Sequence, residues 1–77
     1  MAAPMNHLAW LYLQQGKVEE ALPLSRLAVQ LLSDEANFLD TLAEILLSTG
    51  EKQEASRHMK RVVQLDPSLN HKLERFK

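Results

Sequence analysis

The stretch LAWLYLQQGKVEEALPLSRLAVQL, residues 8–31, is followed 34 residues later by a similar stretch, LAEILLSTGEKQEASRHMKRVVQL, residues 42–65. Nine positions are identical, where average residue usage would give roughly one or two by chance. The identical pairs are Leu8/Leu42, Ala9/Ala43, Leu13/Leu47, Gly16/Gly50, Glu20/Glu54, Ala21/Ala55, Val29/Val63, Gln30/Gln64 and Leu31/Leu65. The sequence is therefore a duplicated unit of 34 residues, and repeats of this length are typical of stacked helical hairpins.

The first unit is predicted to form two helices separated by its glycine, because apolar residues recur at steps of three and four on both sides. The first helix is expected to begin near Pro4 and to end before Gly16, a residue suited to a left-handed helix cap. The second helix is expected over about residues 18–32. Pro23 lies inside it and removes a bond to the carbonyl of Glu19, which predicts a kink without a break.

The second unit repeats this pattern. Ser33 or Asp34 is predicted to cap a third helix that ends at Gly50. Its apolar stripe comprises Phe38, Leu39, Leu42, Ile45 and Leu46, and the stripe of the fourth helix comprises Ala55, Met59, Val62 and Val63. Asp66-Pro67-Ser68 then ends the fourth helix and begins a short fifth helix with Leu73 and Phe76 on its apolar side.

Small residues recur where two helices of a hairpin must approach each other closely. Larger side chains at these positions would push the paired helices apart. The positions are Ala9, Ala21, Ala43 and Ala55.

The units resemble the tetratricopeptide repeat, a helix-turn-helix unit of 34 residues. In the first unit the skeleton positions hold Leu8, Ala9, Tyr12, Gly16, Ala21 and Ala28, and in the second they hold Leu42, Ala43, Leu46, Gly50, Ala55, Val62 and Pro67. The stretch LDTLAEILLSTGEKQEA, residues 39–55, is similar to bacterial members of the family. The sequence departs from the family pattern at Met5, Ser33, Lys52 and Met59.

The resemblance implies an all-α, right-handed superhelix of two hairpins and a short C-terminal helix. One domain would span residues 1–77, with the first repeat at about 2–35, the second at about 36–69 and the C-terminal helix at about 68–77. It also implies a module that binds a peptide or helix of a partner protein in a concave groove and carries out no chemistry. The chain would then be part of a larger scaffold protein.

Six apolar residues in a row, residues 8–13, are more than one face of a helix can bury. If Leu8, Ala9, Leu11 and Tyr12 pack within and between hairpins, Trp10 lies on the other side, which the resemblance implies is the groove. Two interpretations of Trp10 stay open: a core residue packed on residues 1–5 or on the next helix, or an anchor for a partner. The predicted groove residues are Asn6, His7, Trp10, Leu13, Gln14, Asp40, Thr41, Glu44, Leu47 and Ser48.

No enzyme site, metal site or cofactor is expected. The sequence has no cysteine and only two glycines, too few for a Gly-rich phosphate loop. Its three histidines, His7, His58 and His71, have no second ligand at a convincing metal spacing. Glu54 and His58 form the best pair, but a solvated pair on one helix is the more ordinary interpretation.

The expected partner is a protein. Family members that bind a C-terminal carboxylate use a clamp of lysine, asparagine and arginine, and here Asn6, Trp10 and Thr41 stand at the matching positions, so that clamp is absent. Asp40 and Glu44 favour an apolar or weakly basic peptide. The net charge of −1 favours neither nucleic acid nor a membrane as partner. No apolar run approaches the roughly 18 residues of a membrane span, and residues 1–4 do not resemble a signal peptide, so a cytoplasmic location is expected.

Self-association is the alternative function, because two repeats are fewer than the roughly three usually needed for stability. Residues 1–50 carry two basic and six acidic side chains, and residues 51–77 carry seven and four. Such a distribution suits acidic-to-basic stacking of copies through apolar ends, giving a homo-oligomer. In the simpler interpretation the basic residues only solvate the last helices; they are Arg57, Lys60, Arg61, Lys72, Arg75 and Lys77.

Overall fold

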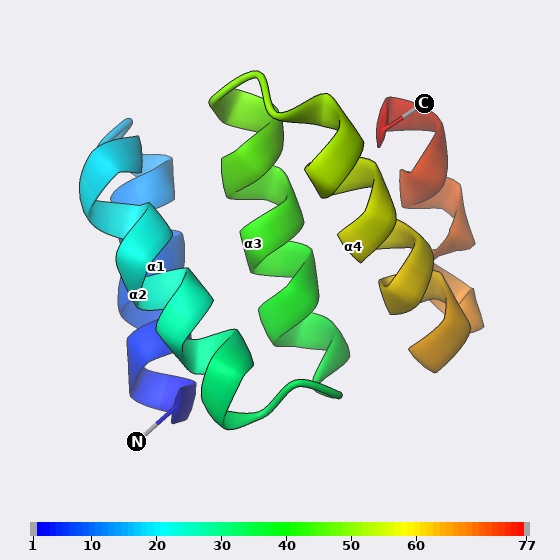
Figure 1. Ribbon diagram of the computed structural model, residues 1–77, viewed down its shortest axis with the longest axis horizontal. Helices are drawn as coiled ribbons and strands as arrows, with labels where there is room; N and C mark the ends of the chain where they lie inside the picture. The colour runs from blue at the N-terminus through cyan, green and yellow to red at the C-terminus, as the bar shows by residue number, and fades with distance from the viewer. Residues whose placement is uncertain (1, 77) are drawn as a thin grey trace.

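The computed structural model describes residues 2–76. It contains helices α1 (Ala2–Gln14), α2 (Val18–Leu31), α3 (Ala36–Ser48) and α4 (Lys52–Leu65), followed by a 3-10 helix, η1 (Pro67–Phe76). Helices α1 and α2 form one antiparallel hairpin, α3 and α4 form the second, and η1 packs along α4 (Figure 1). The predicted all-α fold of two hairpins and a C-terminal helix is confirmed.

The two glycines end the first helix of each hairpin, as predicted. Gly16 and Gly50 have φ angles of 77° and 87°, which a residue with a Cβ rarely adopts. The N–H of the residue after each glycine donates to a carbonyl five residues back, at 2.8 Å from Lys17 to Tyr12 and 2.9 Å from Glu51 to Leu46. Both turns therefore use the same left-handed cap, which satisfies carbonyls at the helix end.

The predicted start of the first helix, near Pro4 with this proline in the first turn, is confirmed, whereas the predicted cap of the third helix is wrong. Helix α1 begins at Ala2, and Pro4 falls inside its first turn, where a missing N–H costs no intrahelical bond. Helix α3 begins at Ala36 after the extended residue Glu35, whose carbonyl accepts the first helical N–H bonds. Neither Ser33 nor Asp34 caps this helix, because the chain is not yet helical there and the Asp34 carboxylate is bonded to Arg61 at 3.1 Å.

Helix α2 continues without a break through Pro23, as predicted. The bend expected at this residue stays a prediction.

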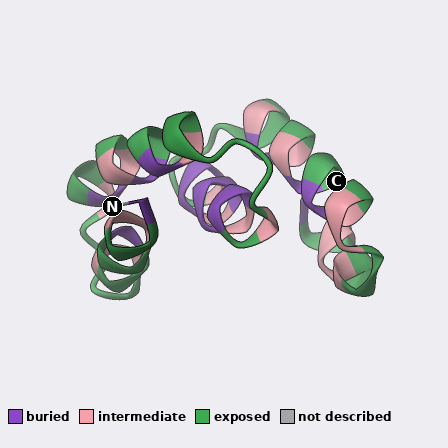
Figure 2. Ribbon diagram, turned by 90° about the horizontal axis from the view of Figure 1, so that it is seen from below, coloured by how far each residue is buried: buried purple, intermediate pink, exposed green. Residues whose placement is uncertain are grey.

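The core is concentrated on α3, the central helix (Figure 2). Every residue of its predicted apolar stripe is buried, and the four small residues predicted at close helix approaches, Ala9, Ala21, Ala43 and Ala55, are all fully buried. Phe76 is buried at the other side of α4, where Leu69 and Leu73 also pack against the core. Helix η1 therefore covers α4 in the way that α3 covers α2.

The first helix is less covered than its sequence predicts. Leu8 and Leu11 were expected to pack within and between hairpins, but they are 40% and 37% exposed. Their equivalents in the second repeat, Leu42 and Ile45, are 2% and 0% exposed and lie in clusters that include Leu22 of α2. The difference arises because no helix within residues 2–76 lies in front of α1 as α2 lies in front of α3.

Candidate partner-binding groove

An open hollow of about 540 Å³ lies on the inner side of the arch formed by the helices. Figure 2 shows this arch, with α1 and η1 at its two ends and α3 between them. Helices α1, α3 and η1 all contribute to the wall, and we call this space the inner hollow. Its lining residues are Asn6, Trp10, Leu13, Gln14, Asn37, Asp40, Thr41, Glu44, Lys72 and Arg75.

Seven of the ten predicted groove residues meet around the inner hollow: Asn6, Trp10, Leu13, Gln14, Asp40, Thr41 and Glu44. The other three, His7, Leu47 and Ser48, are not among its lining residues. His7 is exposed, Leu47 packs against the core, and the exposed Ser48 donates its hydroxyl hydrogen to the carbonyl of Glu44 at 3.2 Å. Leu47 therefore does not join Trp10 and Leu13 around the inner hollow.

Trp10 is the largest apolar side chain of the hollow and is 45% exposed. The interpretation of Trp10 as a core residue is therefore wrong; any packing on Met1 lies outside the described residues. Leu13 beside it is half-buried and packs against Ala9, Ala21 and Ile45. One wall of the hollow is thus an indole with much of its surface open to solvent, on a helix that packs against α2 and α3 through Ala9 and Leu13.

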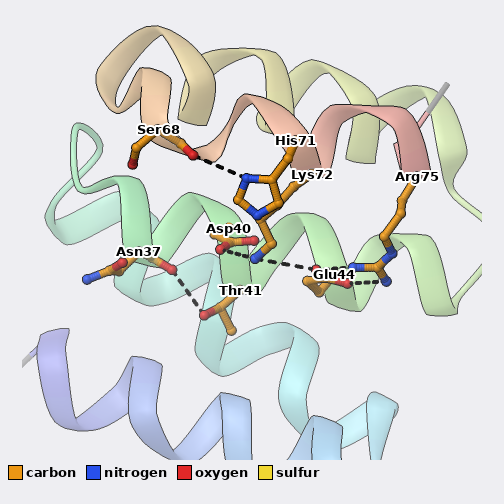
Figure 3. Close-up of polar contacts among 8 residues, drawn as sticks. All are labelled: Asn37, Asp40, Thr41, Glu44, Ser68, His71, Lys72 and Arg75. Atoms are coloured by element: carbon orange, nitrogen blue, oxygen red, sulfur yellow. Dashed lines mark hydrogen bonds and ion pairs between the residues drawn. The ribbon is translucent and has the colours of Figure 1, made fainter.

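Two hydrogen-bond acceptors of the hollow have no donor. Asn6 and Asp40 stand at the same position of the two repeats, and the Oδ1 atom of each is buried without a hydrogen-bond partner among the described residues. The nearby Thr41 hydroxyl is already used, because it donates to the carbonyl of Asn37 at 3.0 Å (Figure 3). A buried acceptor without a donor is costly, so these two atoms are unsatisfied polar groups on residues that line the hollow.

Basic side chains from η1 complete the hollow (Figure 3). Lys72 Nζ lies 2.6 Å from Asp40 Oδ2 and 3.7 Å from Glu44 Oε2. Arg75 donates two hydrogen bonds to the Glu44 carboxylate, at 2.8 and 2.9 Å. These bonds raise the pKa of Arg75 above its ordinary value.

No sequence argument placed Lys72 and Arg75 in the groove. The interpretation that they only solvate the last helix is wrong. Asn37 was missed as well. In a 3-10 helix, side chains three residues apart point in the same direction, so Lys72 and Arg75 both reach α3. Their spacing of three is the signal that was available. Residues three apart also share a face in an α-helix, so the spacing groups these two cations without showing that they face α3.

The ion pairs change the expected electrostatics of the site. Asp40 and Glu44 favoured a weakly basic peptide only if their charges were open to the partner. Each carboxylate already has a cation within hydrogen-bond distance, so the formal charges of the lining residues cancel. The inner hollow therefore favours a partner segment without a strong net charge.

A second group of charged side chains connects α2 with α4. Arg26 of α2 forms a two-point ion pair with Glu54 of α4, at 2.8 and 3.2 Å, and His58 Nε2 lies 3.5 Å from the same carboxylate. The Arg26 hydrogen bond is the main reason that the pKa of Glu54 lies below its ordinary value of 4.5. Glu54 thus links the two hairpins, and its pairing with His58 is secondary to its pairing with Arg26.

Within residues 2–76 no group of three or more side chains has the composition and placement to hold a metal ion. None of the helices in the same range has the length and apolar content needed to cross a membrane.

Two sequence models of the tetratricopeptide repeat match the chain, one over residues 2–32 and the other over residues 36–69. A comparison with curated proteins finds no match. Tetratricopeptide repeats generally mediate protein–protein interactions and are typically non-catalytic. The two matched segments coincide with the two helical hairpins of the structure. The chain belongs to the tetratricopeptide repeat family.

Proposed function

We propose that the chain is a non-catalytic interaction module that binds a peptide or helix of a partner protein in the inner hollow. The observation that carries the proposal is Trp10, 45% exposed on the inner side of α1, beside two buried acceptors without donors. Exposed aromatic side chains in a concave site supply much of the binding energy of protein interfaces. The remaining parts of the proposal are a scaffold role within a longer protein and the absence of catalysis.

The chemistry of the hollow specifies its partner. An apolar side chain of the partner packs on Trp10 and Leu13, which removes their exposed surface from water. Since Lys72 and Arg75 already neutralise the acidic side chains, the bound segment has an apolar residue flanked by uncharged polar ones.

The proposal is tested by selecting binders from a displayed library of random peptides and measuring their affinity for three chains. The first is the unchanged chain, the second is Trp10→Ala, and the control is Leu11→Ala, which removes an exposed apolar residue from another side of the same helix. Loss of an anchor residue costs 2 kcal/mol or more, which corresponds to an affinity loss of roughly 30-fold. We expect this loss for Trp10→Ala, and less than about threefold for Leu11→Ala.

Circular dichroism of the two variants is the control for folding. Selected peptides that bind Trp10→Ala as tightly as the unchanged chain would exclude the inner hollow as the binding site.

A further inference from the structure

A second open hollow, of about 870 Å³, lies between α4 and the end of η1. Figure 1 shows the end of η1 beside the start of α4. We call this space the outer hollow. Its lining residues are Lys52, Gln53, Ser56, Arg57, Lys60 and Phe76. None of them lines the inner hollow, so the two hollows are separate surfaces of the chain.

The outer hollow is lined by three basic side chains and no acidic one. Lys52, Arg57 and Lys60 are all exposed, and within residues 2–76 none of them has a carboxylate partner. Other basic side chains of the same range do form ion pairs with carboxylates; these are Arg26, Arg61, Lys72 and Arg75. Apart from Lys17, which lies over the Tyr12 ring, the basic side chains that lack a carboxylate therefore gather around the outer hollow.

The first repeat has no such concentration of charge at the same positions. The residues 34 positions before those that α4 contributes to the outer hollow are Val18, Glu19, Leu22, Pro23 and Arg26. They include one acidic and one basic residue, so their formal charges cancel. The positive charge of the outer hollow is therefore a property of the second repeat and not of the repeat fold.

The first repeat also shows what a cation at this face does. Arg26 of α2 stands 34 positions before Lys60, and it donates two hydrogen bonds to the carboxylate of Glu54 on α4, at 2.8 and 3.2 Å. Lys60 holds the same position in the second repeat, but in the described part of the chain no carboxylate pairs with it. The position that meets a carboxylate inside the chain is thus occupied at the outer hollow by a cation without one.

We propose that the outer hollow binds an acidic segment of a partner protein through ion pairs with Lys52, Arg57 and Lys60. Arg57 and Lys60 are three residues apart on one helix and repel each other, so a carboxylate beside them removes this repulsion and adds attraction. Lys52 and Lys60 are separated by about 12 Å along α4. Carboxylates four residues apart in an extended segment are separated by about 13 Å. The matching segment therefore carries acidic residues at alternating positions.

Other anionic partners fit the outer hollow less well. Proteins that bind single-stranded nucleic acid stack the bases on aromatic side chains, but Phe76, the aromatic residue of this hollow, is only 2% exposed. Helices that bind an anionic membrane combine cations with exposed large apolar residues, and no such residue lines the outer hollow. A protein segment agrees with the interactions that tetratricopeptide repeats generally mediate. None of these contacts involves the inner hollow, so the proposal goes beyond the proposed function and does not depend on it.

The test uses a fluorescein-labelled peptide in which four glutamates alternate with serines, and its binding to the chain is measured by fluorescence anisotropy at low salt. A peptide with glutamine in place of each glutamate is the control for the charge. We expect saturable binding of the glutamate peptide and none of the glutamine peptide. The affinity should fall as salt rises, because the ion pairs become screened.

Substitutions locate the binding site. Arg57→Gln/Lys60→Gln removes two cations of the outer hollow and should weaken the binding of the glutamate peptide about 5- to 10-fold. Lys17→Glu is the matched control, because it lowers the net charge by the same two units at a residue that does not line the hollow. This control should change the affinity by less than about twofold. Circular dichroism checks that every variant keeps its helical content.

Four results would overturn the proposal. No binding of the glutamate peptide at low salt would mean that the three cations only solvate α4. An equal loss of affinity in Lys17→Glu would mean that net charge, and not the outer hollow, attracts the peptide. If oligodeoxythymidine or phosphatidylserine vesicles displace the labelled peptide more effectively than the unlabelled peptide does, the hollow serves nucleic acid or a membrane. A molar mass that doubles at low salt in the unchanged chain, but not in Arg57→Gln/Lys60→Gln, would make a second copy the occupant.

Discussion

Leu8 and Leu42 occupy the same position in the two repeats, yet Leu42 is 2% exposed and Leu8 is 40% exposed. Leu42 belongs to the core cluster on which Leu22 and Val29 of α2 pack, whereas no helix of the described chain covers Leu8. One residue type at one repeat position therefore has two energetic roles. The difference depends only on whether another helix lies in front of it.

This relationship predicts unequal costs for the same substitution. Leu42→Ala should lower the free energy of unfolding by about 2–5 kcal/mol, because it leaves a cavity in the core. Leu8→Ala should lower it by less than about 1 kcal/mol, because an exposed side chain loses little contact. Urea unfolding measures both values, and equal losses would contradict the packing described for α1.

The sequence predicts the fold because the identities at an offset of 34 define the unit, and each glycine marks a turn that needs a positive φ. The periodicity also predicts which residues of α3 face inward. It cannot predict the exposure of Leu8 and Leu11, since a repeat position specifies the side of a helix and not whether a neighbour exists. Lys72 and Arg75 were missed for another reason: their contacts depend on how the C-terminal helix docks beside α3, which the residue pattern does not indicate.

Removing the two cations of η1 should change the charge preference of the inner hollow. In the double variant Lys72→Gln/Arg75→Gln, Asp40 and Glu44 lose their partners. A selected peptide with one added lysine should therefore bind this variant about 5- to 10-fold more tightly than it binds the unchanged chain. The gain should shrink at high salt because the charges become screened. Isothermal titration at low and high salt measures it.

The matched control removes the same net charge elsewhere. Arg57 and Lys60 of α4 line a different hollow together with Phe76, away from the residues of the inner hollow. Arg57→Gln/Lys60→Gln should therefore leave the affinity for the lysine-containing peptide nearly unchanged. An equal gain in this control would mean that total charge, and not the pairing of Asp40 and Glu44, decides the preference.

The ion pair between Arg26 and Glu54 should make part of the stability depend on pH. The pKa of Glu54 is lowered in the folded chain, mainly by the Arg26 hydrogen bond, so the pair stabilises the fold above the ordinary value of 4.5. This contribution is lost as the pH falls through the lower, folded-state pKa. Glu54→Gln should cost about 0.2–1 kcal/mol at neutral pH, as expected for a partly exposed pair, and almost nothing in strong acid.

Urea unfolding of the unchanged chain and of Glu54→Gln at several pH values checks this dependence. Glu19→Gln, which changes an exposed carboxylate in the first turn of α2, is the control. If Glu54→Gln costs as much in strong acid as at neutral pH, the ionised pair is not the source of the stability.

Replacing Ser25 with alanine should stabilise the fold. Its side chain is fully buried in α2, and its hydroxyl has no hydrogen-bond partner among residues 2–76. Ser25→Ala removes this unsatisfied group and should raise the free energy of unfolding by up to about 1 kcal/mol. Thr41→Val is the contrasting variant. The Thr41 hydroxyl donates to the carbonyl of Asn37, so the loss of this hydroxyl should destabilise the fold by about 0.5–1.5 kcal/mol. Thermal unfolding distinguishes the two, and destabilisation by Ser25→Ala would mean that its hydroxyl has a partner in solution.

The inner hollow is tested most directly by mapping amide chemical shifts of the isotopically labelled chain during titration with a selected peptide. We predict saturable shifts that are largest at the indole N–H of Trp10 and at the backbone N–H groups of Asp40 and Thr41, which line the inner hollow. Shifts centred on Leu8, Leu11 and Leu27, with Trp10 unchanged, would contradict the assignment of the inner hollow as the partner site.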